Sequence, residues 1–207
     1  MSILNKLSSQ SGDRTESANR AVVAECIANP ALLQEIAAGL EFKDAKLVGD
    51  CAEVLAHVAS VYPDRVAPYA GLLATRLSHR NTRVRWEAMH ALALIAALVP
   101  HVIASLLPKL GEILASEKST IVRDYAIDTL GNYAATGKQA AEQAFPLLVQ
   151  ALKSKQTARA LNGLAHVARL APARVGDLLQ IADDYADHDR PVIRKAAKQL
   201  QKTIEGI

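Results

Sequence analysis

The stretch Leu106–Ala135, LLPKLGEILASEKSTIVRDYAIDTLGNYAA, carries the pattern that decides the fold. Two apolar stripes with three- and four-residue spacing, typical of helices with one buried side, flank a polar segment. The first stripe ends at Leu114 and the second begins at Val122. The polar segment is Ser116–Thr120, and Ser119 is the predicted N-cap of the second helix. The stretch therefore predicts two helices joined by a short break.

The same helix pair recurs along most of the chain, at intervals of about 34 to 38 residues. One column of the second helices holds small residues: Cys51, Ala88, Ala126, Ala160 and Ala197. Another holds leucines: Leu55, Leu92, Leu130 and Leu164. A pair of this length cannot bury its apolar side alone, so neighbouring pairs must stack. Five pairs are predicted, in the spans Pro30–Tyr62, Asp64–Val99, His101–Ala135, Gln139–Leu170 and Ala173–Ile204.

Composition agrees with a helical protein. Half of the 207 residues are hydrophobic, only 4% are aromatic, and alanine and leucine are good helix formers. Residues 1–29 are predicted to form an N-terminal lead-in and capping helix, in which residues 8–17 are polar and mobile and Ala18–Ala28 is helical. Residues 30–207 are expected to form a repeat array that continues from this helix as a single domain.

The second helices of three pairs open with an aliphatic residue followed by arginine: Val84-Arg85, Val122-Arg123 and Ile193-Arg194. With the proline in the first helix, Pro108, this pattern resembles the HEAT repeat over residues 30–205. Val48 and Thr157 replace the arginine in the first and fourth pairs. The resemblance implies an all-α, right-handed α-α superhelix, an α-solenoid of about five HEAT-type pairs plus an N-terminal helix. It also implies a scaffold or binding surface as the function.

The repeated arginines are expected to be half-buried, with each charge paired to a carboxylate of a break; ligand binding is the alternative. Asp189, before Pro191, is predicted to be the N-cap of the last helix. Cys26 and Cys51 lie on apolar stripes and are predicted to be buried free thiols.

A different column of the second helices is predicted to point away from the core, and stacked second helices line one long face of such arrays. Its members are Gly49, Glu53 and His57, then Trp86, His90 and Leu94, then Asp124, Asp128 and Asn132, and finally Ala158, Asn162 and His166. Trp86 is the only tryptophan, and exposed tryptophan is enriched at interaction hot spots. An ordinary solvated face is the alternative. The predicted partner-binding residues are Trp86, His90, Asp124, Asp128, Asn132, Asn162 and His166.

No catalytic, nucleotide-binding or metal motif is present, so no catalytic residue, cofactor or metal ligand is assigned. We therefore predict a non-catalytic protein-interaction scaffold. The alternative is a nucleic-acid-binding protein or a HEAT-like DNA glycosylase, which would use an acid among aromatic and basic residues. Asp124 and Asp128 are not expected to be ringed by such residues, and the net charge of +3 argues against strong phosphate binding. A protein is therefore the expected partner.

The last helix is predicted to be a terminal cap, with the array standing alone, because apolar positions of earlier repeats become polar at Lys198, Gln201 and Lys202. Arg194, Lys198 and Lys202 then form a basic row at four-residue spacing. The row serves solubility or docks an acidic partner or nucleic acid. No apolar run reaches the length of a membrane span or a secretory signal, so the expected location is the cytoplasm, with no membrane partner.

Overall fold

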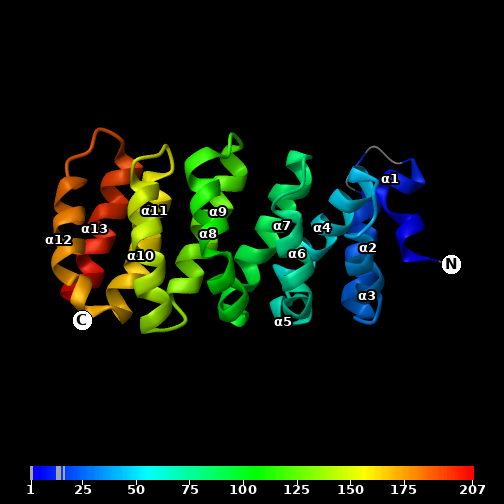
Figure 1. The fold of residues 1–207 in the computed structure, drawn as a ribbon, viewed down its shortest axis with the longest axis horizontal. Coiled ribbons are helices and arrows are strands. Elements are labelled where there is room, and N and C mark those ends of the chain that lie inside the picture. Colours follow the sequence, from blue (N-terminus) through cyan, green and yellow to red (C-terminus); the bar gives the residue numbers. More distant parts are fainter. Residues whose placement is uncertain (1, 13–14, 16) are drawn as a thin grey trace. The chain divides into compact units, whose positions relative to one another are not determined.

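A computed structural model describes residues 2–12, 15 and 17–207 of the chain. They group into two compact units, unit 1 up to Val99 and unit 2 from Pro100 to Ile207. Within the described ranges every regular element is a helix, which confirms the predicted all-α class (Figure 1). The expectation of a single continuous domain remains a prediction.

Unit 1 begins with the short helices η1 (Ile3–Lys6) and α1 (Ser8–Ser11), followed by α2 (Ser17–Ala28). The first helix pair is α3 (Leu32–Gly39) and α4 (Ala45–Ala59). In the second pair the first helix is divided into three short segments, α5 (Pro63–Val66), η2 (Ala67–Tyr69) and α6 (Ala70–Arg76). The second helix is α7 (Thr82–Ile95), which continues into η3 (Ala96–Leu98).

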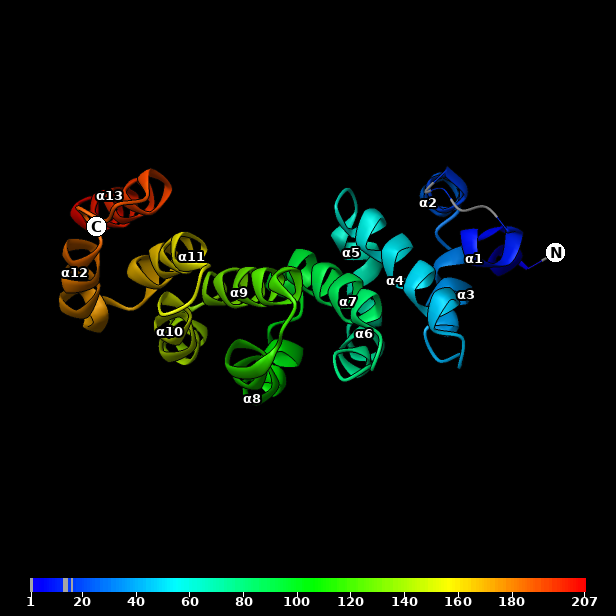
Figure 2. The same ribbon diagram turned by 90° about the horizontal axis from the view of Figure 1, so that it is seen from above.

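Unit 2 contains the remaining three pairs, and each is visible as two neighbouring helices from above (Figure 2). The third pair is α8 (Pro100–Ser116) and α9 (Thr120–Ala134). The fourth is α10 (Lys138–Leu152) and α11 (Thr157–Leu170). The fifth is η4 (Pro172–Arg174) with α12 (Val175–Asp184), and then α13 (Pro191–Glu205). The five predicted spans therefore correspond to the observed pairs.

Each unit buries the two columns that the repeat pattern predicts. In unit 1, Cys51, Leu55, Ala88 and Leu92 are fully buried between α4 and α7. In unit 2 the corresponding residues of α9, α11 and α13 are buried, namely Ala126, Leu130, Ala160, Leu164 and Ala197. These columns hold consecutive second helices together because small residues let the backbones approach while leucines fill the space beside them.

Two glycines bring α9 and α11 especially close. A methyl group added at Gly131 would lie 3.1 Å from Gly163 Cα, and one added at Gly163 would lie 2.8 Å from Leu148 Cδ2. The neighbour of the methyl group added at Gly131 is backbone, which yields less readily than the end of the Leu148 side chain, so Gly131 is the position that most favours a residue without a side chain. The two second helices therefore meet backbone to backbone.

Three of the second helices have a side-chain N-cap, of which Ser119 was predicted. Ser119 accepts a hydrogen bond from the Val122 N–H, as predicted, and Asp44 and Asn81 cap α4 and α7 in the same way. The predicted N-cap of the last helix, Asp189, is wrong. The N-cap of α13 is Arg190, which has the extended backbone of that position and makes no side-chain cap hydrogen bond. Pro191 at the first position of α13 leaves one fewer N–H to satisfy there.

Two of the repeated arginines, Arg85 and Arg194, bind main-chain oxygens of the break that precedes them. Arg85 Nη1 donates to the carbonyls of His79 (2.8 Å) and Arg80 (3.1 Å). Arg194 Nη1 makes the matching bonds to two carbonyls of the last break, 2.8 and 3.0 Å long. Arg194 therefore binds main-chain oxygens where pairing with a break carboxylate was expected. Every break presents main-chain carbonyl groups to the arginine, whatever its sequence. A carboxylate is present only where the break contains Asp or Glu.

The N-terminal segment packs on the first repeat instead of forming a mobile lead-in. Leu7 is fully buried, and α1 and α2 both contact α4. Ser9 N–H donates to Asp50 Oδ2 at 2.8 Å. Consequently Gly49 and Glu53, which were expected to point away from the core, are buried, while His57 one turn further on is exposed. Residues 13, 14 and 16 of the predicted lead-in lie outside the described residues.

Candidate functional site

In unit 1 the two candidate residues project from α7. Trp86 is half-buried, not freely exposed as predicted, and its Nε1–H donates to Glu87 Oε1. His90, one turn further on, is half-buried and its Nδ1 lies 4.0 Å from Glu87 Oε2. Burial lowers the pKa of His90, and the neighbouring His57 lowers it further, so His90 is neutral at physiological pH. Neutral imidazole and indole together form a partly apolar surface with hydrogen-bonding edges.

Trp86 borders a hollow of about 650 Å³ between α7 and the N-terminal segment. Its lining combines hydroxyl, cationic and anionic side chains: Ser8, Ser9, Gly12, Thr15, Asn19, Lys46, Asp50, Glu53, Arg83, Trp86 and Glu87. Because the lining carries both positive and negative side chains, it does not favour a ligand of either charge. Trp86 therefore stands at the rim of a polar hollow and not on a flat helical face.

A buried ion cluster forms the floor of this hollow. Arg83 Nη2 lies 2.7 Å from Asp50 Oδ1 and 2.5 Å from Glu53 Oε2. Asn19 Nδ2 donates to the same two carboxylates at 3.1 and 2.9 Å. Asp50 and Glu53 are only 1% and 7% exposed, so their charges depend on these donors. The cluster ties α2 and α7 to α4 and has a structural role in unit 1.

In unit 2 two candidate carboxylates lie on α9 and share one cation from α11. Arg159 Nη1 pairs with Asp128 Oδ2, and its Nη2 lies 3.8 Å from Asp124 Oδ2. Arg159 is therefore a basic neighbour of both acids. Burial raises the pKa of Asp128, with Arg159 acting in the opposite direction and Asp124 raising it further. The pairing holds α9 and α11 in register on their outer side.

The other three candidates of unit 2 surround this ion pair on the same two helices. Asn132 and Asn162 are exposed, and His166 is half-buried with a pKa lowered by burial and, secondarily, by Arg169. His166 also lies beside Gly131, where the two helices meet. The five candidates of unit 2 thus lie on adjacent helices, as the column predicted. Arg159, which the sequence reasoning missed, stands one place after the column member Ala158.

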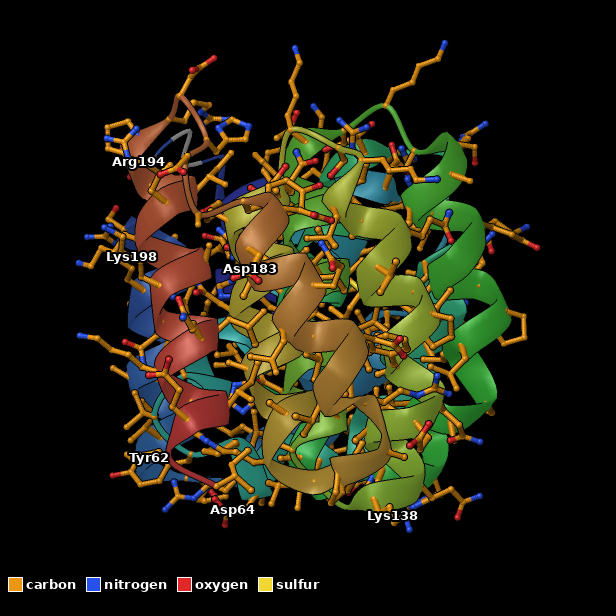
Figure 3. The ribbon with its side chains drawn as sticks, turned by 90° about the vertical axis from the view of Figure 1, so that its left-hand side faces the viewer. Tyr62, Asp64, Lys138, Asp183, Arg194 and Lys198 are labelled. Carbon is orange, nitrogen blue, oxygen red and sulfur yellow. The ribbon has the colours of Figure 1, made fainter. Side chains whose placement is uncertain are left out.

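The predicted basic row lies on α13. Lys198 and Lys202 are exposed, whereas Arg194 is half-buried because its guanidinium binds the preceding break. Figure 3 shows Arg194 and Lys198 projecting from α13, beside Asp183 on the neighbouring α12. Lys195, which was not part of the predicted row, is exposed on the same helix. The row is therefore a wider basic surface than the four-residue spacing indicated.

Three further features bear on the class of function. No helix in the described part of the chain is both long and apolar enough to span a bilayer. Cys26 and Cys51 are buried free thiols, as predicted. Over the same described ranges, no three His, Cys, Asp or Glu side chains come together as potential metal ligands.

Comparisons with known proteins address the fold. No protein-family model and no curated protein matches this sequence. An engineered protein matches with a TM-score of 0.78 and 18% identity, over 99% of this chain and 95% of its own. A designed armadillo repeat protein in complex with the peptide (KR)4 matches with a TM-score of 0.78 and 17% identity, over 98% of each chain. The archaeal HEAT-like repeats protein from Thermococcus onnurineus NA1 matches with a TM-score of 0.58 and 16% identity, over 91% of this chain and 93% of its own.

Helix pairs with buried second-helix columns, together with these structural matches, define an α-solenoid of the HEAT and armadillo type. This confirms the fold that the resemblance to HEAT repeats implied.

Proposed function

We propose that the protein is a non-catalytic scaffold that binds a protein partner through the outward residues of its second helices. In unit 1 these are Trp86 and His90. In unit 2 they are Asp124, Asp128, Asn132, Asn162 and His166. The bound segment is expected to be a peptide in extended conformation, whose main-chain groups the exposed asparagine amides can both donate to and accept from.

The observation that carries this proposal is the surface of unit 2. Backbone contact at Gly131 and Gly163 sets α9 and α11 side by side, with Asn132 and Asn162 exposed on them. Arg159 holds the two aspartates between the same helices. A polar surface fixed by packing and ion pairing loses little conformational entropy on binding. A designed repeat protein of the same fold is found in complex with a peptide, which supports the same use here.

The test is selection of peptides from a random library with the purified protein, followed by affinity measurement on variants. Trp86→Ala is expected to weaken the binding of a peptide selected by unit 1 by about 2 kcal/mol or more, as truncation of a hot-spot tryptophan does. Asn162→Ala is expected to weaken the binding of a peptide selected by unit 2 by about 1 kcal/mol, the contribution of one or two hydrogen bonds. Melting temperatures should change little, because neither side chain lies in the core.

Gln150→Ala is the matched control, since Gln150 carries an exposed amide on the first helix α10. An equal loss of affinity in Gln150→Ala and Asn162→Ala would contradict the proposed surface. Unchanged affinity in both Trp86→Ala and Asn162→Ala would contradict it as well. The enzymatic alternative is checked with alkylated DNA, and release of a modified base at catalytic rates would overturn the scaffold function.

A further inference from the structure

The last helix, α13, carries cations on its outward surface without anions among them. Lys195, Lys198 and Lys202 are exposed, and the helix contains a single acidic residue, Glu205, at its end. Buried residues of the same helix, such as Ile193 and Leu200, occupy its opposite side. The lysines are therefore displayed to solvent by a helix that is anchored in the core of unit 2.

Three cations of unit 2 have counter-ions, whereas these lysines have none among the described residues. Arg159 pairs with two aspartates, Arg174 with Glu142, and Lys109 with Glu112. No described residue forms an ion pair with Lys195, Lys198 or Lys202. Three neighbouring ammonium groups on one helix repel one another, so an anionic partner would relieve an unfavourable interaction as well as form new pairs.

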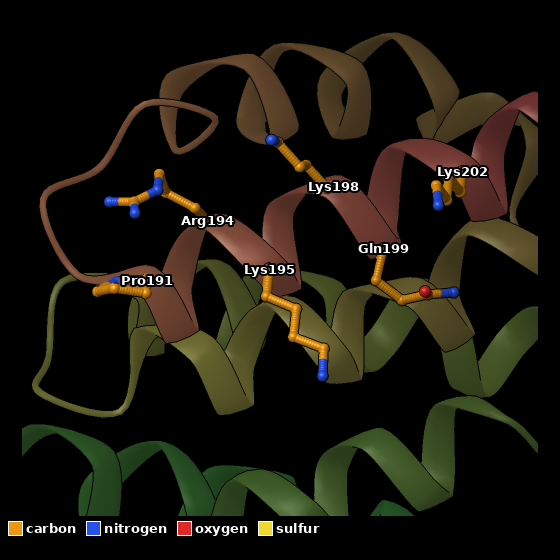
Figure 4. Close-up of a pocket in the computed structure, with 6 residues that line it drawn as sticks. All are labelled: Pro191, Arg194, Lys195, Lys198, Gln199 and Lys202. Carbon is orange, nitrogen blue, oxygen red and sulfur yellow. The ribbon is translucent and has the colours of Figure 1, made fainter.

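The cations border a shallow hollow of about 340 Å³ that runs along the helix (Figure 4). One side of the hollow is the row Pro191, Lys195 and Gln199, and the other is the row Arg194, Lys198 and Lys202. Residues four apart in a helix form such ridges, and the groove between two ridges accepts a ridge of another helix. Successive cations in a row are separated by about 6 Å along the helix axis.

We propose that this surface, the α13 basic groove, docks an acidic helical segment of a partner protein. Carboxylates at four-residue spacing on the partner would have the same axial repeat of about 6 Å and would meet Lys198 and Lys202 in turn. The proposal is independent of the second-helix surface, because Lys198 and Lys202 do not belong to the proposed second-helix binding residues.

A protein segment fits this groove better than nucleic acid does. The adjacent α12 and the turn after it carry five exposed carboxylates, Asp177, Asp183, Asp184, Asp187 and Asp189. A polyanionic backbone that extended past α13 would meet them, whereas a short acidic helix would not. The groove also lacks an aromatic side chain on which a base could stack.

The experiment measures fluorescence anisotropy of a labelled peptide that consists of repeats of Glu-Ala-Ala-Ala. Binding to the full chain is expected at low salt and should weaken as salt rises. Lys198→Glu with Lys202→Glu should weaken binding about tenfold, since two attractive contacts become repulsive. Lys153→Glu with Lys155→Glu is the control, because both are exposed lysines of unit 2 outside α13 and the change in net charge is identical.

Helical ellipticity shows whether the variants are folded, and Lys198→Gln with Lys202→Gln replaces the reversal if the latter unfolds. Equal loss in the α13 and control variants would mean that only net charge matters and would overturn the proposal. Tighter binding of a DNA duplex than of the peptide, with the same sensitivity to the α13 variants, would assign the groove to nucleic acid instead. Absence of peptide binding at low salt would also overturn it.

Discussion

At the scale of single residues, Asp50 shows how an ionised group is kept inside a helical core. Burial alone would raise the pKa of this carboxyl group. Hydrogen bonds from Ser9, Asn19 and Arg83 outweigh burial and lower the pKa below its ordinary value. The folded state therefore stabilises the ionised carboxylate of Asp50 relative to the unfolded chain. The stability of the fold consequently depends on pH through this residue.

The first consequence concerns Asp50→Asn. Because the folded pKa is depressed, the contribution of Asp50 is complete above the unfolded pKa of about 3.9 and disappears as pH falls through the folded pKa. We expect the difference in unfolding free energy between the native protein and Asp50→Asn to be largest near neutral pH and to shrink below about pH 4. Urea denaturation at several pH values measures it. The exposed Asp64→Asn should show no such trend, and a constant difference for Asp50→Asn would refute the assignment.

At the scale of elements, the approach of α9 and α11 depends on two residues without side chains. Helix propensity favours alanine over glycine by about 1 kcal/mol in a helix interior. Gly131 and Gly163 occur inside helices in spite of that preference, and a methyl group added at Gly131 would lie only 3.1 Å from Gly163 Cα. The packing of one helix on the next therefore outweighs the local preference of the backbone.

Gly131→Ala tests this balance. The new methyl group would meet the Gly163 backbone at 3.1 Å, so overpacking should lower the unfolding free energy by about 1–3 kcal/mol. Gly176→Ala is the control in the same unit, since nothing lies within 4 Å of its added methyl group. It should be neutral or stabilise the helix by up to about 1 kcal/mol. Thermal denaturation of both variants measures the change in stability. Stabilisation by Gly131→Ala would contradict the prediction, because it would show that α9 and α11 can move apart without loss of stability.

Helix boundaries and core columns were predictable because they follow from periodicity within single helices. The N-terminal segment was not, since its polar sequence gives no sign that Ser9 and Asn19 satisfy Asp50 on another helix. Ion pairs between repeats were also not predicted, although the sequence separation of their partners is similar in three cases. Arginine follows its acidic partner by 33 residues in Asp50–Arg83, by 31 in Asp128–Arg159 and by 32 in Glu142–Arg174. The spacing alone is not sufficient, because Arg76 lies 32 residues after Asp44 and binds the Leu40 carbonyl instead.

At the scale of the whole molecule, each unit has a buried core of its own, and the natural reporter groups are unevenly distributed. Trp86, Cys26 and Cys51 all belong to unit 1. Both thiols are fully buried. Burial raises the pKa of Cys26 to about 11, with Glu25 adding to the effect, and that of Cys51 to about 12, with Asp50 and Cys26 adding. Tryptophan fluorescence and thiol reactivity therefore report on the same unit.

We accordingly expect neither cysteine to react with a thiol reagent in the native protein at about pH 8, where almost no thiolate exists at such pKa values. In a denaturant series, labelling should begin where the tryptophan emission of unit 1 changes, because both need the same core to open. The number of labelled thiols is counted by mass spectrometry. Rapid native labelling of either cysteine would contradict its burial.

The bonds of Arg85 and Arg194 to main-chain oxygens have a bearing on evolutionary divergence. The acceptor five residues before each arginine belongs to Arg80 in one break and to Asp189 in the other, residues of opposite charge. A contact with the backbone places no demand on the side chain that the acceptor residue carries, so the turn can accumulate substitutions while its geometry stays fixed. Selection on such a contact leaves a trace at the arginine alone. The two breaks of this chain illustrate the point, because Arg80 and Asp189 accept the same bond although their side chains are unlike.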